Sequence, residues 1–219
     1  MSLRKLKTAE YWNKEAQAFD SLYSEKKTRV AQAFDKFFRR GMYERFQRTL
    51  ENSYPIEGRA FLDVGCGSGR YCLELARRGA KRIVGIDVSE EMLQMAYQAC
   101  KSQDLLQKCE FIETDVSQFM PDESFNVSIA MGLFDYVKEP LPVLKNIKAV
   151  TTDYMLIAFP RRWSWRTLLR KIYLGIKKCD VYFYSKEKIA ELMRGLGVKK
   201  YKIDKVAGLF FVKAFVPNI

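Results

Sequence analysis

A glycine-rich turn between two regular elements constrains the fold of this 219-residue chain more than any other feature. Residues 61–71 read FLDVGCGSGRY, an apolar run followed by Gly65, Gly67 and Gly69 and then by a helix-like stretch. Glycine has no Cβ and tolerates positive φ, so such a turn exposes bare backbone to a ligand. The N-terminus of the following helix adds free N–H groups. The pattern therefore predicts a strand, a ligand-binding turn and a helix.

Acidic residues follow the next two predicted strands and narrow the choice of ligand. The apolar run 82–86 ends at Asp87, about 20 residues past the turn, where a carboxylate can accept hydrogen bonds from a ribose diol. The run 109–113 leads into Thr114 and Asp115. The glycine spacing is G-x-G-x-G, whereas dinucleotide-binding folds have G-x-G-x-x-G, which disfavours an NAD-dependent oxidoreductase.

Together these motifs resemble the class I S-adenosylmethionine (SAM)-dependent methyltransferases over roughly residues 58–216. The resemblance implies that the glycine turn surrounds the methionine part of SAM, that Asp87 holds the ribose and that Asp115 holds the adenine. Met92 contacts the adenine ring or packs in the core, and the Tyr23 hydroxyl is expected near the cofactor carboxylate. Cys66 is interpreted as a small side chain in the turn rather than a nucleophile. The cofactor-binding residues so implied are Tyr23, Asp63, Gly65, Cys66, Gly67, Gly69, Asp87, Val88, Met92, Asp115, Val116 and Met131.

The order of the elements predicts the fold class. Strand and helix patterns alternate, a fifth strand over 154–159 is expected to stop at Pro160, and strands 201–206 and 210–216 form an antiparallel pair. This predicts an α/β protein with a doubly wound, seven-stranded, mostly parallel sheet of Rossmann-like methyltransferase type and an N-terminal helical cap. The predicted boundaries are a cap over residues 1–57 and a SAM-binding core over 58–219, with an insertion at 160–184 near the active site.

The cap and the insertion are expected to shape the acceptor site. Helices are predicted over 9–20 and 28–50, and Tyr11 in the first either lines the substrate pocket or packs onto the core. Segment 161–178 carries many cations and no acid. Arg161 and Arg162 could bind an anionic substrate; alternatively, 162–178 contacts a membrane surface or simply covers the sheet edge as an amphipathic helix.

Composition limits the class of protein further. The 38 Lys and Arg against 26 Asp and Glu give a net charge of +12, which favours anionic partners such as nucleic acid, anionic small molecules or a membrane surface. Five scattered cysteines without a C-x-x-C pair, and no apolar run of about 18 residues or more, suggest a cytoplasmic chain. No metal-binding motif is present, and histidine is absent.

The chemistry expected of such a site needs few groups, because SAM carries an activated methyl group and the protein mainly aligns the reactants. Asp135 and Tyr136, after the fourth strand, are the candidate catalytic residues, or they cap a turn. The chain lacks both the (Asp/Asn)-Pro-Pro-(Tyr/Phe) motif of amino-methylating nucleic-acid enzymes and a Pro-Cys pair. We therefore expect a small-molecule acceptor, anionic or aromatic, methylated at O or N. An RNA methyltransferase and a non-catalytic SAM-binding protein are the alternatives.

Overall fold

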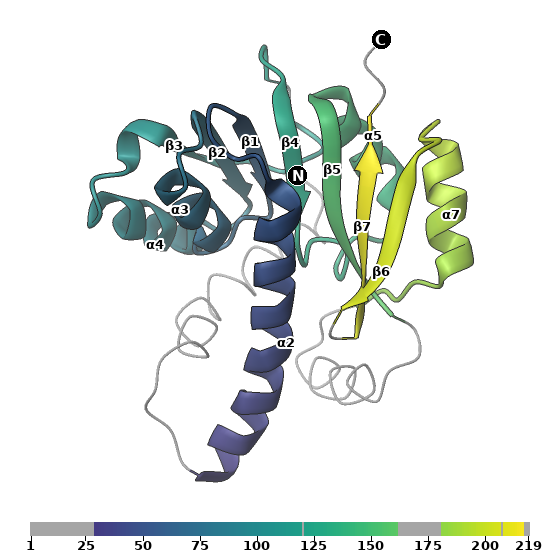
Figure 1. Cartoon of the computed structure of the whole chain (residues 1–219), viewed down its shortest axis with the longest axis horizontal. Coiled ribbons are helices and arrows are strands. Elements are labelled where there is room, and N and C mark those ends of the chain that lie inside the picture. The colour runs from purple at the N-terminus through teal and green to yellow at the C-terminus, as the bar shows by residue number, and fades with distance from the viewer. Residues whose placement is uncertain (1–28, 120, 162–180, 207, 217–219) are drawn as a thin grey trace.

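A seven-stranded sheet forms the centre of the computed structural model, which describes residues 29–119, 121–161, 181–206 and 208–216, with side chains from residue 41 onward (Figure 1). The strand order is β3-β2-β1-β4-β5-β7-β6. Neighbours from β3 through β5 are parallel, whereas β7 runs antiparallel to both β5 and β6, which confirms the predicted fold class. The strands are β1 (Ala60–Val64), β2 (Arg82–Asp87), β3 (Cys109–Glu113), β4 (Phe125–Ala130), β5 (Thr151–Pro160), β6 (Tyr201–Val206) and β7 (Leu209–Phe215).

Helices cover both faces of the sheet, α2, α3 and α4 on one and α5 and α7 on the other (Figure 1). Each face has its own hydrophobic cluster: Leu75 belongs to the first, Leu144 and Ile189 to the second. Successive strand residues point to opposite faces, so Phe61 enters one cluster and Leu62 the other. The helices are α2 (Arg29–Ser53), α3 (Arg70–Arg77), α4 (Glu90–Lys101), α5 (Pro140–Ala149) and α7 (Lys186–Gly195), with a 3₁₀ turn η1 (Leu106–Lys108).

The strand order creates a reversal point between β1 and β4. From β1 the chain proceeds outward to β2 and β3, then returns to place β4 on the other side of β1. In open parallel sheets ligands bind beyond the carboxyl ends of the strands at such a point, because the two connections diverge there and leave room. The sheet therefore directs attention to the residues that follow β1 and β4.

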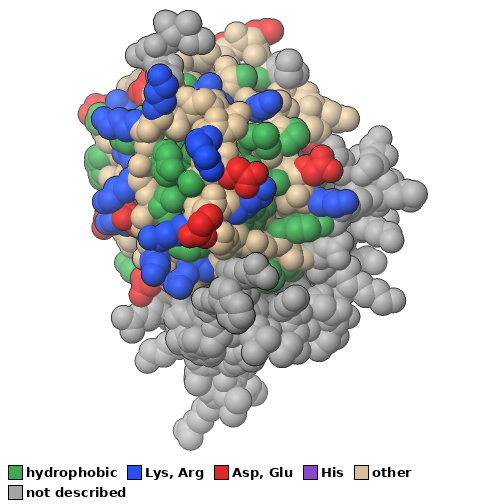
Figure 2. Space-filling model, turned by 90° about the vertical axis from the view of Figure 1, so that its right-hand side faces the viewer, with side chains coloured by type: hydrophobic (Ala, Val, Ile, Leu, Met, Phe, Trp, Pro, Cys, Tyr) green, Lys and Arg blue, Asp and Glu red, His purple; other side chains and the backbone are tan. Residues whose placement is uncertain are grey.

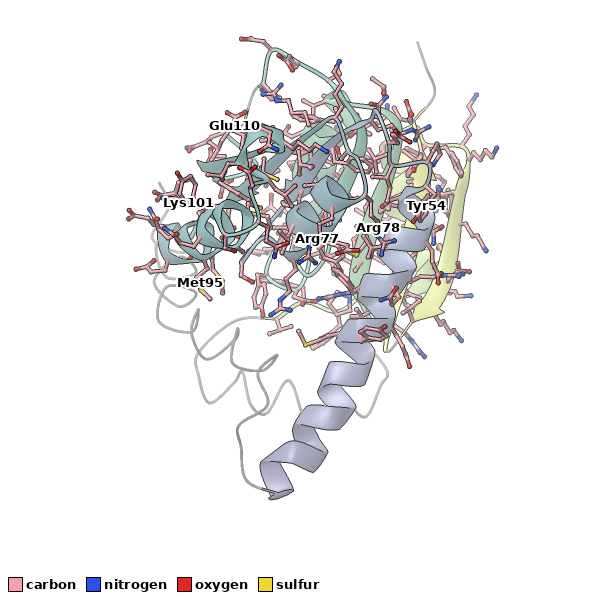
Figure 3. The ribbon with its side chains drawn as sticks, turned by 60° about the vertical axis from the view of Figure 1, so that its left-hand side comes forward. Tyr54, Arg77, Arg78, Met95, Lys101 and Glu110 are labelled. Carbon is pink, nitrogen blue, oxygen red and sulfur yellow. The ribbon has the colours of Figure 1, made fainter. Side chains whose placement is uncertain are left out.

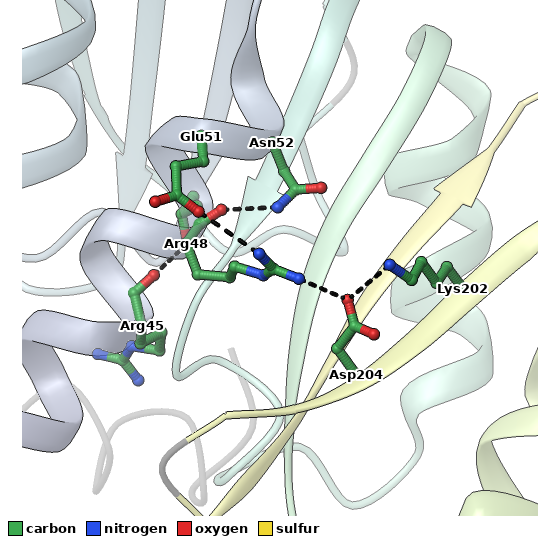
Figure 4. Close-up of polar contacts among 7 residues, drawn as sticks. Arg45, Arg48, Glu51, Asn52, Lys202 and Asp204 are labelled. Carbon is green, nitrogen blue, oxygen red and sulfur yellow. Dashed lines mark hydrogen bonds and ion pairs between the residues drawn. The ribbon is translucent and has the colours of Figure 1, made fainter.

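The C-terminal part of α2 is attached to both halves of the sheet. The Arg78 guanidinium at the end of α3 donates to the Tyr54 hydroxyl over 3.1 Å (Figure 3). On the other side, Arg48 of α2 pairs with Asp204 of β6 over 3.1 Å (Figure 4), and the Lys213 ammonium donates to the Asn52 carbonyl over 2.9 Å. These contacts fix the end of α2 above the sheet. The other predicted cap helix, over 9–20, lies outside the described residues.

The prediction for the fifth strand was wrong at both ends. β5 begins at Thr151, three residues earlier than expected, and it includes Pro160. Proline is tolerated there because β4 pairs with β5 only as far as Ile157, so no β4 carbonyl needs an N–H from residue 160. The Pro160 carbonyl accepts a hydrogen bond from the Tyr184 N–H over 2.8 Å. The last strand also differs by one residue at each end, since β7 is Leu209–Phe215.

None of the helices in the described part of the chain is long and apolar enough to span a membrane.

Candidate cofactor-binding site

The three glycines of the turn all have positive φ, but they serve two different purposes. At Gly69, φ is 72° and an added Cβ would lie 2.6 Å from the Ala96 Cβ, so this glycine lets α3 pack against α4. At Gly65 an added Cβ would meet only Leu133, at 3.5 Å, and at Gly67 only the Met92 sulfur, at 3.9 Å. Among the described residues only Leu133 and Met92 approach these two positions, both at ordinary van der Waals distance, so the backbone there can face a ligand.

Asp87, at the end of β2, holds the turn in place. Its Oδ2 accepts the Gly67 N–H over 2.9 Å and its Oδ1 accepts the Ser89 N–H over 3.0 Å. Burial raises the pKa of Asp87, and these N–H donors oppose that change. Each carboxylate oxygen can accept more than one hydrogen bond, so acceptor capacity for a diol remains. Ser89 in turn caps α4, because its hydroxyl accepts the Met92 N–H over 3.2 Å.

Asp63 is buried beneath the turn, on the face of β1 that contacts α3. The Cys72 thiol donates to its Oδ2 over 3.5 Å. Burial raises the pKa of Asp63 to about 7; the charge of Asp87 adds to this effect and the charge of Arg45 opposes it. Cys66 is also buried; its hydrogen bond to Cys72 lowers the thiol pKa, but burial and the nearby carboxylates raise it overall. A protonated buried thiol fits a small packing residue.

The remaining predicted cofactor residues surround the same ends of β2, β3 and β4. The Asp115 carboxylate accepts the Ser117 N–H over 2.8 Å, which orders the turn after β3. The Val116 carbonyl accepts the Asn146 side-chain amide over 3.3 Å. Met92 is buried beside Gly67, Met131 is buried directly after β4, and Val88 is half-buried beside Asp87.

The predicted catalytic pair lies after β4, and a segment distant in sequence packs over it. The Asp135 side chain is only 2% exposed, whereas Tyr136 is half-buried. The Asp135 carbonyl accepts the Tyr182 N–H over 2.9 Å, and the Tyr184 hydroxyl donates to the Val137 carbonyl over 3.3 Å. Burial and the charge of Asp135 raise the pKa of Tyr184, which keeps this phenol protonated.

The sequence interpretation missed two groups that the fold brings to this region. One is the segment 181–184, which returns to the ends of β4 and β5 and packs the Tyr184 ring against Phe159 in a tilted arrangement, with ring centres 4.9 Å apart. Its aromatic composition, VYFY, was the available signal. The other is Arg45 of α2, which lies beside Gly132. Nothing in the sequence separates Arg45 from the other arginines of α2, at positions 29, 39, 40 and 48.

Of the predicted substrate-binding residues, only Arg161 is described. Its guanidinium lies over the Phe210 ring, 5.5 Å from the centroid, and its backbone forms a bridge to Tyr184. Tyr11 and Arg162, the predicted cofactor residue Tyr23 and the whole of the predicted membrane-contact segment 162–178 lie outside the described residues. Within the part of the chain that is described, no group of three or more Cys, Asp or Glu side chains could hold a metal ion.

Comparison with known proteins agrees with this geometry. Residues 61–153 match the family model described as a methyltransferase domain. A tRNA U34 carboxymethyltransferase of Haemophilus influenzae (strain PittEE) is 33% identical over 104 residues, which are 48% of this chain and 32% of that protein. The match thus spans about a third of the length of the curated relative.

Solved structures share the fold at low sequence identity. The magnesium protoporphyrin IX methyltransferase ChlM from Synechocystis PCC 6803, solved with bound SAH, superposes with a TM-score of 0.76 at 18% identity, covering 95% of this chain and 97% of that one. A SAM-dependent methyltransferase from Aquifex aeolicus gives a TM-score of 0.60 at 21% identity, covering 78% and 89% of the two chains.

The strand order, the glycine turn at the reversal point and the carboxylate after β2 are those of the class I methyltransferase fold. Residues 61–153 match the methyltransferase domain family, and nearly the whole chain shares the fold of a methyltransferase solved with bound SAH. The site fits SAM as its cofactor: the backbone of two glycines can face a ligand, and a carboxylate with remaining acceptor capacity lies where a ribose diol is expected.

Proposed function

We propose that this protein transfers the methyl group of SAM to a small-molecule acceptor, at an oxygen or a nitrogen atom. The observation that carries the proposal is the enclosure of the β4 end, where Asp135 is 2% exposed and the segment 181–184 packs over it. A small acceptor can be surrounded in such a site, whereas a base within a polynucleotide must be extruded into it.

On the cofactor side, the chain's own residues would bind and orient SAM. The N–H groups around Gly65 and Gly67 and the N-terminus of α3 would face the methionine part of SAM. Asp87 would accept the ribose hydroxyls, with Val88 and Met92 beside it. Asp115, Val116 and the Met131 backbone would hold the adenine. When bound, SAM supplies an activated methyl group, so alignment is the main contribution of the protein.

On the acceptor side, Asp135 and Tyr136 are proposed to orient the acceptor and, where it bears a proton, to receive it. Tyr136 is the more exposed of the two, so it would contact the acceptor directly, and Asp135 would act from behind it. The nearby rings of Phe134, Phe159 and Tyr184 pack within 4.9 Å between centroids, which makes the surroundings apolar and suits a planar or aromatic acceptor. Tyr11, Arg161 and Arg162 remain proposed substrate-binding residues.

An RNA acceptor is the second candidate, because the curated relative acts on a tRNA and the net charge is +12. The surface in Figure 2 lends it little support. On that face lysines and arginines are interspersed with acidic and hydrophobic side chains and do not gather into one cationic patch. Sequence-independent RNA binding depends on several phosphate contacts and weakens steeply with salt.

One experiment separates the two candidates. Purified protein is incubated with methyl-labelled SAM and either a low-molecular-weight metabolite extract or total RNA, with Asp87→Ala as the inactive control. We expect label in the small-molecule fraction only, and mass spectrometry of the product then identifies the methylated atom. Label confined to RNA, lost when the salt concentration rises from 50 to about 200 mM, would contradict the proposal.

A further inference from the structure

One outer edge of the sheet is formed by β6, which pairs only with β7 among the described strands. The Phe215 N–H donates to the Lys200 carbonyl over 2.9 Å, directly before β6 begins. Because hydrogen-bonded pairs alternate along an antiparallel ladder, the even-numbered residues of β6 bond to β7. Tyr201, Ile203 and Lys205 therefore direct their backbone N–H and C=O groups away from β7, where another strand could bind.

Charged side chains of both signs lie along this edge strand. On the face toward α2, Asp204 pairs with Arg48 over 3.1 Å and with Lys202 over 3.4 Å (Figure 4). Both cations contact its Oδ2 atom, so the carboxylate keeps acceptor capacity. Lys202 is opposite Lys213 on β7, and its side chain is 69% exposed. Lysines on an edge strand usually oppose pairing with another strand, because like charges would meet.

One register of β6 against a second copy of itself avoids that repulsion. In an antiparallel pair, a residue that bonds outward lies opposite another that bonds outward, so only every second register is allowed. With Ile203 opposite Ile203 of the second copy, Lys202 of each copy lies opposite Asp204 of the other. Centring the pair on residue 202, 204 or 205 places a charged residue opposite itself, and centring it on residue 201 places Lys202 opposite Lys200. Of the registers centred on residues 201 to 205, only the one at Ile203 matches opposite charges.

We propose that β6 is a self-association surface, to which a second copy of this chain adds its own β6 in antiparallel orientation with Ile203 at the twofold axis. The pairing joins two sheets into one and gives partners to the outward backbone groups of Tyr201, Ile203 and Lys205 in both copies. The side of the molecule toward α7 and β6 mixes charges of both signs with hydrophobic side chains (Figure 2), which suits contact with an identical surface. Two short strands bury little area, so the dimer is weak and depends on protein concentration. The inference is independent of the proposed function.

The experiment measures association of the full chain by sedimentation velocity, at protein concentrations up to roughly 1 mM. The variants Lys202→Asp and Asp204→Lys are examined singly and as an equal mixture. In the proposed register, Lys202→Asp alone places acids opposite acids and Asp204→Lys alone places lysines opposite lysines. In the mixture every one of these acids lies opposite a lysine, so a heterodimer can form. Lys199→Asp is the matched control, because it makes the same change of charge outside the paired residues 200–206.

We expect a wild-type dimer whose dissociation constant rises roughly tenfold or more in each charge variant, stays within about twofold in Lys199→Asp and recovers in the mixture. Ile203→Pro should abolish the dimer and leave the monomer folded, because the Ile203 N–H does not bond to β7. A monomeric wild type, a dimer that persists in both charge variants or in Ile203→Pro, or a mixture without heterodimers would each overturn the inference. Thermal denaturation verifies folding, and if Ile203→Pro fails to fold, the mixture of charge variants decides alone.

Discussion

The ends of β1 and β2 differ from the ends of β4 and β5 in how their functional residues are positioned. At the ends of β1 and β2, the site is held by hydrogen bonds between residues separated by about 20 positions or fewer in the sequence. The Gly67 N–H that Asp87 accepts is an example. At the ends of β4 and β5, the contacts join residues about 47 apart, as when Tyr182 donates to the Asp135 carbonyl. The proposed cofactor end is therefore a local structure, and the proposed acceptor end depends on contacts between segments far apart in the sequence.

The largest expected effect is a difference in the free energy of unfolding between alanine variants of two glycines in the same turn. Gly69→Ala would strain a positive φ and place its Cβ 2.6 Å from Ala96, so it should lower the free energy of unfolding by about 3 kcal/mol or more. Gly67→Ala strains φ alone and should cost about 1 kcal/mol, while weakening S-adenosylhomocysteine binding. Urea denaturation and calorimetry measure both effects. Similar stability losses for the two variants would disprove the packing role assigned to Gly69.

The buried Asp63 predicts how stability depends on pH. Its pKa is about 7 in the folded protein and 3.8 in an unperturbed carboxyl, so the folded state binds the proton more tightly. Stability from this group is complete below pH 4 and is lost as the pH rises through 7, by at most about 4 kcal/mol. Urea denaturation between pH 5 and 8 should show this decline, and Asp63→Asn should flatten it, leaving the smaller contribution of Asp87. An unchanged slope in the variant would mean that Asp63 is not the titrating group.

The smallest expected effect is the loss of stability when either of two serine N-caps is removed. Ser89 caps α4 beside the cofactor site, and Ser185 caps α7 on the other face, each accepting an N–H over 3.2 Å. Replacing either by Ala should cost about 1 kcal/mol of stability. Only Ser89→Ala should also weaken S-adenosylhomocysteine binding, because loss of the cap loosens the start of α4, where the backbone N–H of residue 89 helps to hold Asp87. Loss of affinity in Ser185→Ala as well would indicate a general effect of stability on binding.

The contrast between the two ends also explains what the sequence could predict. Strand, turn and helix around Gly65 to Gly69 follow from local preferences, so this unit and the positions of Asp63 and Asp87 were accessible from the sequence pattern. The fold class followed from the alternation of strands and helices together with the family resemblance. The approach of Tyr182 to Asp135 and of Arg45 to Gly132 depends on how α2 and the segment before α7 pack on the sheet. No local pattern encodes such long-range contacts. The extension of β5 through Pro160 was missed for the same reason, since it depends on where the neighbouring β4 ends.

The most direct test of the cofactor assignment is a calorimetric titration with S-adenosylhomocysteine and, separately, with NADH. It uses the wild type, Asp87→Ala and the control Glu113→Ala, which removes an exposed carboxylate paired in register with Asp87 on the adjacent strand. We predict micromolar binding of S-adenosylhomocysteine alone, weakened by about 1–3 kcal/mol in Asp87→Ala and unchanged in Glu113→Ala. Absence of binding, or a preference for NADH, would contradict the assignment of this site to SAM.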